Sequence, residues 1–358
     1  MMKALLHFLI RKIAYSDHKK RQTAGSVLVN VSSGIGDAVM AEPLIRSVRT
    51  SLPTGIIGVL CSPPTEVIFR RHPSINVVFV LPTGLWARLQ LIWAIRKQGF
   101  DIYIGALPSN TIRHLLIPYF ASIPRRIKHR SPHQGHQNYD FLFDPVVPLD
   151  KTKHRVLCNL DLLPPIGLEA VNSVPQLDVD KGTLAKVQKE LSRAGWDASY
   201  SLVGFHIGCN PAAMEKRWPP ERFAEVARHL YAKTQSCILL LGGPDEKEEN
   251  RVFESRFDGI ILNFAGKLNL LETAAAITFC SFFISNDSGL MHLATAVNRP
   301  AFAIFGPKDE RHIGPFGNRH TVIRKGSRVD DVQTNDVIKV LEDSEFGIPS
   351  LQRSNIRE

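Results

Sequence analysis

The chain has 358 residues, of which 44% are hydrophobic and 22% charged, a composition that excludes a disordered protein and is typical of a folded globular one. Since a single hydrophobic core rarely grows beyond roughly 250–300 residues, the length favours two domains. The formal net charge of +10 favours anionic partners such as nucleic acid, anionic lipid or phosphorylated substrates. The sequence has no zinc-finger spacing, RNA-binding aromatic signature or basic region before a heptad repeat, so we expect no nucleic-acid partner.

The cysteine and hydropathy patterns indicate where the protein works. The five cysteines are scattered and form no CxxC pair, which is typical of a protein from a reducing cytosol. No apolar run reaches the roughly 18–20 residues that a membrane span needs. We therefore expect a cytoplasmic protein.

The N-terminal segment, residues 1–25, combines an apolar and a basic stripe at helical spacing. The apolar stripe contains Leu5, Leu9 and Ile13, and the basic stripe contains Lys3, His7 and Arg11. This pattern suits an anionic membrane surface, although a helix that packs on its own domain fits it equally well. The segment is too short for a convincing signal peptide and lacks a small-residue cleavage site.

Residues 26–175 alternate between short apolar runs and amphipathic helical stretches, which predicts a parallel sheet covered by helices. We expect strands over 26–33, 55–62, 76–82 and 100–108, and helices over 38–52, 85–99 and 156–169. Pro43 predicts a kink or a late start in the first of these helices, and Pro164 ends the last. Residues 126–154 are rich in Pro, His and basic side chains and predict a loop.

The same alternation starts again in residues 176–346. We expect helices over 182–196, 220–233, 249–257, 270–280 and 289–298, and strands over 201–208, 237–243, 259–266, 281–285 and 301–306. Two successive units joined near residues 172–180 predict an α/β protein of two doubly wound, Rossmann-like domains with a cleft between them. In such sheets ligands bind beyond the carboxyl ends of the strands. The polar tail, residues 347–358, is expected to fray.

The first predicted strand ends in the sequence SSGIGDAV, a glycine-rich turn into a helix. Gly34 and Gly36 allow a ligand to approach the backbone, and the helix start leaves amides open to an anion. The dinucleotide-binding fingerprint is incomplete, because Val39 stands where a third glycine is expected and no acidic residue ends the next strand. Asp37 is either the N-cap of the helix or a carboxylate that takes a proton from a hydroxyl group.

The second half opens with the sequence HIGCNPAAMEKRWPPERF. Its strand closes at His206 and Gly208, and Lys216 and Arg217 stand just before a helix. Ammonium and guanidinium groups complement phosphate oxygens, so the two cations suit a polyanion. A solvated loop explains them equally well.

A glycine pair ends the next strand in the sequence LLLGGPDEKEEN. Gly242 and Gly243 would let a flat or anionic part of a ligand approach the backbone, and Asp245 or Glu246 could accept hydrogen bonds from ribose hydroxyls. The alternative is an ordinary turn followed by acidic residues that the helix dipole favours.

The sequence ISNDSGLMHLATAVN places a polar turn between a buried strand and a helix. Asp287, Ser288 and Gly289 occupy the turn, and the amides at the helix start should be unpaired and carry partial positive charge. Such a helix end favours a diphosphate. His292 could add a hydrogen-bond donor to this site, but a structural role explains a single histidine equally well.

Two further features of the sequence are ambiguous. Paired carboxylates such as Asp178 and Asp180 bind divalent metals, but the pair lies in the expected linker and Asp180 is placed to cap a helix, so we expect no metal. The basic run at residues 124–130 could meet acceptor phosphates or be a solvated loop. No nucleophile elbow and no P-loop motif occur.

Taken in order, these motifs resemble the heptosyltransferases of glycosyltransferase family 9, which build the inner core of lipopolysaccharide. The resemblance rests on SGIGDAVMAEPLIRSVRTSLP, EKRWPPERFAEVARHL, LLGGPDE and NDSGLMHLATAVNRPAFAIFGP with the trailing GPFG, and it spans residues 26–325. It implies a GT-B fold, with the acceptor mostly on the first domain and the donor mostly on the second. It also implies inverting transfer without a metal or other cofactor.

The resemblance assigns roles to individual residues. Asp37 is expected to be the general base, Lys216 the cation on the donor diphosphate, and Asp287, Ser288 and Gly289 the cradle for the donor sugar and phosphates. The expected partners are ADP-L-glycero-D-manno-heptose and a lipid-linked oligosaccharide. The resemblance therefore also implies a cytoplasmic protein. Peripheral contact of the protein with the cytoplasmic face of the inner membrane is left open. The chain departs from the family pattern at Pro307 and Lys308, where a small hydroxyl residue is common.

Three other functions remain alternatives at this point. Another nucleotide sugar could serve a different surface glycan. A sugar-nucleotide epimerase of the same fold would turn over donor without acceptor, and a non-catalytic nucleotide-binding module would bind ADP and transfer nothing.

Overall fold

The computed structural model describes residues 25–106, 112–130, 139–210 and 212–348 of the chain. The chain divides into two compact units, residues 1–174 and 175–358. The predictions made for residues 1–24 and for most of the polar tail lie outside the described residues. No helix in the described part of the chain combines the length and the apolar character that crossing a bilayer requires.

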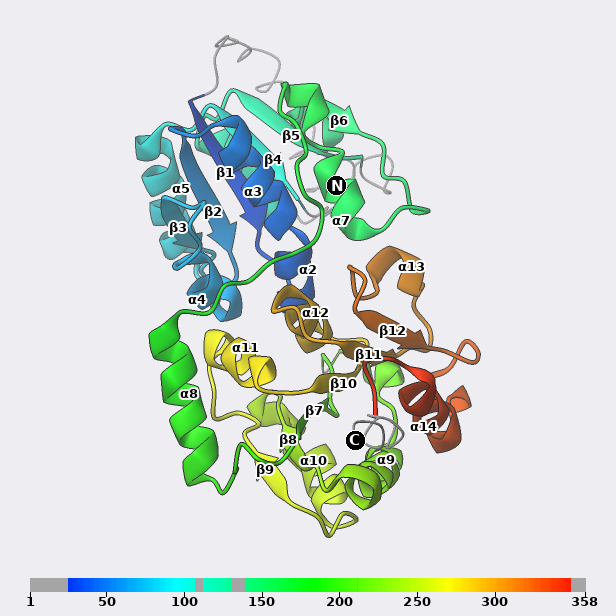
Figure 1. Cartoon of the computed structure of the whole chain (residues 1–358). Helices are drawn as coiled ribbons and strands as arrows, with labels where there is room; N and C mark the ends of the chain where they lie inside the picture. The colour runs from blue at the N-terminus through cyan, green and yellow to red at the C-terminus, as the bar shows by residue number, and fades with distance from the viewer. Residues whose placement is uncertain (1–24, 107–111, 131–138, 211, 349–358) are drawn as a thin grey trace, which may run out of the picture. The chain divides into compact units, whose positions relative to one another are not determined.

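Unit 1 contains a parallel sheet of six strands in the order β3-β2-β1-β4-β5-β6 (Figure 1). Its strands are β1 (Ser26–Val31), β2 (Ile56–Cys61), β3 (Val77–Val80), β4 (Ile102–Gly105), β5 (Arg125–His129) and β6 (Val146–Val147). The apolar runs predicted as strands form the centre of this sheet, and β1 is buried along its whole length. Burial on both faces explains why these strands are apolar throughout rather than at every second residue.

Six α-helices accompany the sheet in the described residues of unit 1. They are α2 (Ile35–Met40), α3 (Glu42–Ser51), α4 (Glu66–Phe69), α5 (Leu85–Gln98), α6 (Ile112–Phe120) and α7 (Arg155–Leu160). The predicted first helix is divided at Ala41, and Pro43 lies in the first turn of α3, where its missing N–H costs no hydrogen bond. Of the kink or late start predicted from Pro43, the structure shows a break at Ala41, since the helical stretch begins already at Ile35.

The strand β5 corrects the prediction of a loop over residues 126–154. Lys128 is 1% exposed, and its ammonium group donates to Asp140 Oδ1 at 2.5 Å and to the carbonyl of His129 at 3.1 Å. Arg126 is also buried and donates to the carbonyls of Leu142 and Ile123. Both interpretations of the basic run therefore fail for β5, because its buried cations are neither solvated nor available to phosphate.

Unit 2 repeats the architecture, with its strands in the order β12-β11-β10-β7-β8-β9 (Figure 1). The strands are β7 (Leu202–His206), β8 (Cys237–Leu240), β9 (Ile261–Asn263), β10 (Phe282–Asn286), β11 (Ala301–Ile304) and β12 (His320–Ile323). The helices are α8 (Lys181–Arg193), α9 (Pro220–Thr234), α10 (Lys247–Glu254), α11 (Leu270–Thr278), α12 (Gly289–Ala296), α13 (Glu310–Ile313) and α14 (Thr334–Asp343). Asp180 caps α8 by accepting a hydrogen bond from the Thr183 amide, which confirms the role expected for it.

In both units the first strand lies at the centre, the second and third follow on one side, and the fourth to sixth on the other. This is the Rossmann order, so the two predicted Rossmann-like domains are confirmed. The direction of winding reverses between β1 and β4 in unit 1 and between β7 and β10 in unit 2. Ligands of doubly wound sheets bind at the carboxyl ends of the strands at this reversal, which directs attention to the turns after β1, β7 and β10.

Candidate active site

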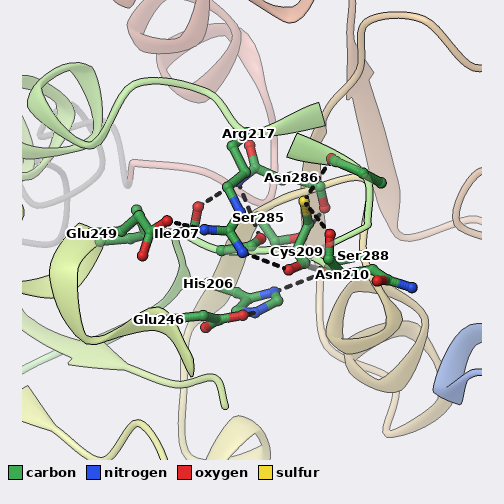
Figure 2. Close-up of polar contacts among 12 residues, drawn as sticks. His206, Ile207, Cys209, Asn210, Arg217, Glu246, Glu249, Ser285, Asn286 and Ser288 are labelled. Carbon is green, nitrogen blue, oxygen red and sulfur yellow. Dashed lines mark hydrogen bonds and ion pairs between the residues drawn. The ribbon is translucent and has the colours of Figure 1, made fainter. Parts of the chain in front are cut away.

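In unit 2, the segments that follow β7, β8 and β10 are joined by buried polar side chains (Figure 2). The side chain of Asn286, the last residue of β10, is fully buried. Its Nδ2 atom donates to the carbonyls of Ile207 at 2.5 Å and Gly208 at 3.2 Å, and its Oδ1 atom accepts from the Trp218 amide at 3.0 Å. One amide side chain thus fixes both ends of the loop that carries Lys216.

Replacing Asn286 with Ala should destabilise unit 2. The change leaves the buried Trp218 amide and two buried carbonyls without their partner, and we expect a loss of about 2–4 kcal/mol in the free energy of unfolding. Urea unfolding measures this loss. The matched control is Asn335→Ala on the exposed side of α14, which should change stability by less than about 0.5 kcal/mol. Equal stability of the two variants would contradict the assigned role of Asn286.

A chain of hydrogen bonds runs from a buried carboxylate to the turn before α12. His206 Nε2 lies 2.9 and 3.1 Å from the two carboxylate oxygens of Glu246, and His206 Nδ1 lies 2.8 Å from Ser288 Oγ (Figure 2). All three side chains are buried. Because a carboxylate only accepts, Nε2 carries a proton, and in the neutral ring Nδ1 then accepts the proton of the Ser288 hydroxyl. These hydrogen bonds link three residues that come from separate motifs of the sequence.

Two glycines make room for this chain. A β-carbon at Gly208 or at Gly242 would collide with the carboxyl group of Glu246, and Gly242 also has a φ of +155°. Gly242 was expected to let a ligand approach the backbone, but the side chain of Glu246 fills this space. Gly243 precedes the short turn that begins at Pro244, and Asp245 in that turn is exposed. Of the two acidic residues considered for ribose, only Asp245 remains available.

The cation expected to meet phosphate lies at the turn after β10. Lys216 Nζ lies 2.6 Å from Asp287 Oδ2, with side-chain exposures of 16% and 7%. Burial raises the pKa of the Asp287 carboxyl, and the hydrogen bond and charge of Lys216 act in the opposite direction. The positive charge of Lys308 acts in the same direction as that of Lys216, so a second, exposed lysine stands within electrostatic range of the turn.

Arg217 has a different environment from its neighbour. Its guanidinium group pairs with Glu249 and donates to the carbonyl of Cys209 at 3.1 Å (Figure 2). Its side chain is 10% exposed. These contacts argue against the expected contact of Arg217 with the nucleotide-sugar donor. They indicate that Arg217 supports the loop after β7.

The helix α12 begins at Gly289, with Ser288 as an extended N-cap whose side chain does not cap the helix. The hydroxyl is instead bound to His206. The amides of the first turn therefore lack the usual side-chain acceptor, as an anion site requires. His292 is 5% exposed, which favours its structural interpretation.

In unit 1, Asp37 lies in the turn after β1. The N-cap of α2 is Gly34, in an extended conformation and without a side-chain cap, so the prediction of Asp37 as N-cap is wrong. Asp37 lies in the first turn of α2, and its Oδ2 atom accepts from Ser33 Oγ at 2.6 Å. The side chain is half-buried, and a β-carbon at Gly34 would meet open space. Gly34 thus leaves the backbone beside Asp37 accessible, and Gly36 lies half-buried in the first turn of α2.

Known proteins are similar to this chain in sequence and in fold. The sequence pattern of glycosyltransferase family 9 (heptosyltransferase) matches residues 88–339. Lipopolysaccharide heptosyltransferase 2 of Salmonella typhimurium is 28% identical over 317 residues, covering 83% of this chain and 87% of that protein. Lipooligosaccharide heptosyltransferase 2 of Haemophilus influenzae is 29% identical over 319 residues, covering 84% and 88%. The solved structure of the Escherichia coli ADP-heptose lipopolysaccharide heptosyltransferase II is similar with a TM-score of 0.75 at 25% identity, covering 88% of this chain and 97% of that one.

The similarity extends over most of each relative, so it concerns a whole enzyme rather than one nucleotide-binding domain. It confirms the resemblance inferred from the motifs and the GT-B fold inferred with it. The family match covers well over half of the chain and includes the turns after β7, β8 and β10. The chain therefore belongs to glycosyltransferase family 9, the heptosyltransferase family, and is a glycosyltransferase.

Proposed function

We propose that the protein transfers heptose from ADP-L-glycero-D-manno-heptose to a lipid-linked acceptor of the lipopolysaccharide core. The transfer inverts the anomeric carbon and uses no metal. The observation that carries this proposal is the ammonium group of Lys216, held beside the uncapped start of α12 by Asp287. The names of the related proteins, which are lipopolysaccharide and ADP-heptose heptosyltransferases, support the choice of donor and acceptor.

The leaving group is a nucleoside diphosphate, so negative charge grows on its oxygens as the bond to the anomeric carbon breaks. Lys216 and the amides at the start of α12 are fixed before the reaction and would meet that charge without reorganisation. Lys308 adds long-range attraction from an exposed position. Together these groups would supply the countercharge that a divalent metal supplies in other transferases.

Ser288 would recognise a hydroxyl group of the donor rather than a phosphate. With the His206 ring neutral and Nε2 protonated, the Ser288 hydroxyl donates its hydrogen bond to Nδ1, so Oγ keeps only lone pairs for a ligand. A sugar hydroxyl can donate to those lone pairs, whereas a fully ionised phosphate cannot. Glu246 and His206 would thus set the direction of this hydrogen bond.

On the acceptor side, Asp37 would remove the proton of the attacking hydroxyl. Ser33 holds one of its oxygens, which fixes the carboxylate at the turn after β1. Direct attack by the acceptor hydroxyl on the anomeric carbon would invert the configuration there. Asp37 then needs no covalent intermediate to act as general base.

Nucleotide-dependent thermal unfolding tests the donor. ADP should raise the melting temperature more than UDP, GDP or CMP at equal concentration, because a ligand stabilises only the state that it binds. At a concentration 100-fold above its dissociation constant, ADP should add about 2.7 kcal/mol to the free energy of unfolding. A larger shift with UDP or GDP would assign a different nucleotide sugar to the site.

A transfer assay with and without acceptor separates the remaining alternatives. The proposal requires ADP release that depends on a lipid-linked core acceptor. Turnover of the donor without acceptor would identify an epimerase. ADP binding without turnover under either condition would identify a nucleotide-binding module.

A further inference from the structure

The helix α5 of unit 1 exposes large apolar side chains on its outer face. Its inner face packs Leu91 and Ile95 into the core, in the same cluster as Tyr103 of β4. The outer face exposes Leu85, Trp86, Leu89 and Trp93, with exposed fractions of 72%, 80%, 49% and 65%. At 100° per residue, Trp86, Leu89 and Trp93 fall on one stripe opposite Leu91 and Ile95. We call the exposed residues Leu85, Trp86, Leu89 and Trp93 the α5 stripe.

A helix that is apolar on both faces is normally buried on both. The contrast with the other tryptophans of the chain is direct, because Trp196 and Trp218 are 8% and 0% exposed. Both exposed indoles therefore lie on one helix, one turn from Leu89. Contiguous apolar surface of this kind marks a site of interaction rather than a random feature of the surface.

The charges beside the α5 stripe indicate what covers it. Arg96 and Lys97 are exposed in the last turn of α5, and Lys97 Nζ lies 5.5 Å from the centre of the Trp93 ring. The helix contains no acidic residue, and the whole chain has a formal net charge of +10. Tryptophan, leucine and cations on one helix face match the interface of an anionic membrane, where indoles lie at the headgroups and lysines meet phosphates.

We propose that the α5 stripe docks the protein on the surface of an anionic lipid membrane, with α5 lying in the plane of the interface. The side chains that enter the lipid are Trp86, Leu89 and Trp93, and Arg96 and Lys97 contact the headgroups. Figure 1 shows α5 beside the strands β2 and β3 of unit 1. This role is separate from sugar transfer and does not depend on the identity of the donor.

The start of β1 lies beside the C-terminal end of α5. Ser26 Oγ donates to the carbonyl of Gly99 at 3.3 Å, and Gly99 is the C-cap of α5. Residues 1–24 precede this point in the chain and lie outside the described residues. The membrane binding expected of that segment can be tested on the same vesicles.

The intrinsic fluorescence of the full chain provides the first test. Vesicles of equal parts phosphatidylcholine and phosphatidylglycerol should shift the emission to the blue, and brominated lipid should quench it, because the two exposed indoles are on α5. Vesicles of phosphatidylcholine alone should give a much smaller effect. No shift and no quenching with the anionic vesicles would overturn the proposal.

Co-sedimentation of variants with the anionic vesicles provides the second test. The pair Trp86→Ser and Trp93→Ser should lower the partition coefficient at least about tenfold, since both indoles leave the interface. The pair Arg96→Ala and Lys97→Ala should lower it by about fivefold for each charge, and less at high salt. The matched controls are Lys189→Ala with Arg193→Ala on the exposed face of α8, and Tyr200→Ser. All these positions are exposed, so thermal unfolding should show every variant folded.

The other possible occupants of the α5 stripe give different results. A second copy of the chain would produce a dimer in sedimentation velocity that the tryptophan variant abolishes, with no vesicle binding. A cover formed by residues 1–24 would shield the indoles from acrylamide until those residues are deleted. Vesicle binding that is lost with residues 1–24 and kept in the tryptophan variant would also overturn the proposal.

Discussion

Replacing Asp37 with Ala should reduce the rate of transfer by about 10²–10⁴-fold, the usual contribution of a positioned general base. The affinity for ADP should stay unchanged, because Asp37 belongs to unit 1 and the proposed nucleotide site to unit 2. Steady-state transfer rates and ADP titrations measure the two effects separately.

The control for Asp37 keeps the shape of the side chain. Asp37→Asn can still accept the hydrogen bond from Ser33 but cannot take a proton, so its transfer rate should fall as far as that of the alanine variant. The variant Ser33→Ala keeps the carboxylate and loses only the hydrogen bond that holds it, so its transfer rate should fall much less. Near-normal turnover of Asp37→Asn would remove Asp37 as the base.

Replacing Lys216 with Met should lower kcat/KM by about 10²–10³-fold, the range for one preorganised donor at a developing negative charge. The effect should appear in kcat as well as in donor affinity, since the charge on the diphosphate is largest in the transition state. Lys308→Met removes an exposed cation that acts at longer range, and should lower kcat/KM by less than about tenfold.

Stability must be separated from catalysis at Lys216. Its removal leaves the carboxyl group of Asp287 buried without its cation, which destabilises the fold by itself. The double variant Lys216→Met with Asp287→Asn removes both charges and should regain stability without regaining activity. Recovery of activity in the double variant would show that Lys216 only neutralises Asp287.

The central strands and most helices could be predicted from the sequence because their apolar runs and breaks are local signals. The strand β5 could not, since four of its five residues are Arg, Lys or His. Its burial depends on Asp140 and on carbonyl groups that lie outside the strand, such as that of Leu142. Patterns of hydrophobicity carry no information about such partners.

The same limit applies to the candidate site. The turns after β1, β7 and β10 could be found because glycines and polar residues interrupt apolar strands there. The partners of individual side chains could not, because His206 and Glu246 are 40 residues apart and His206 and Ser288 are 82 apart. Arg217 resembles its neighbour Lys216 in charge, and only the fold shows that one side chain is occupied by Glu249 and the other lies at the turn.

The closeness of Gly208 and Gly242 to the carboxyl group of Glu246 has a practical consequence for redesign. The three positions form one steric unit, so a larger residue at Gly208 needs a shorter one at position 246, whereas the φ of +155° at Gly242 strains any larger residue there. Shortening residue 246 would in turn leave His206 without the acceptor that orients its ring. Libraries that aim to change donor preference should therefore keep these three positions fixed and vary exposed positions such as Asp245 and Lys308.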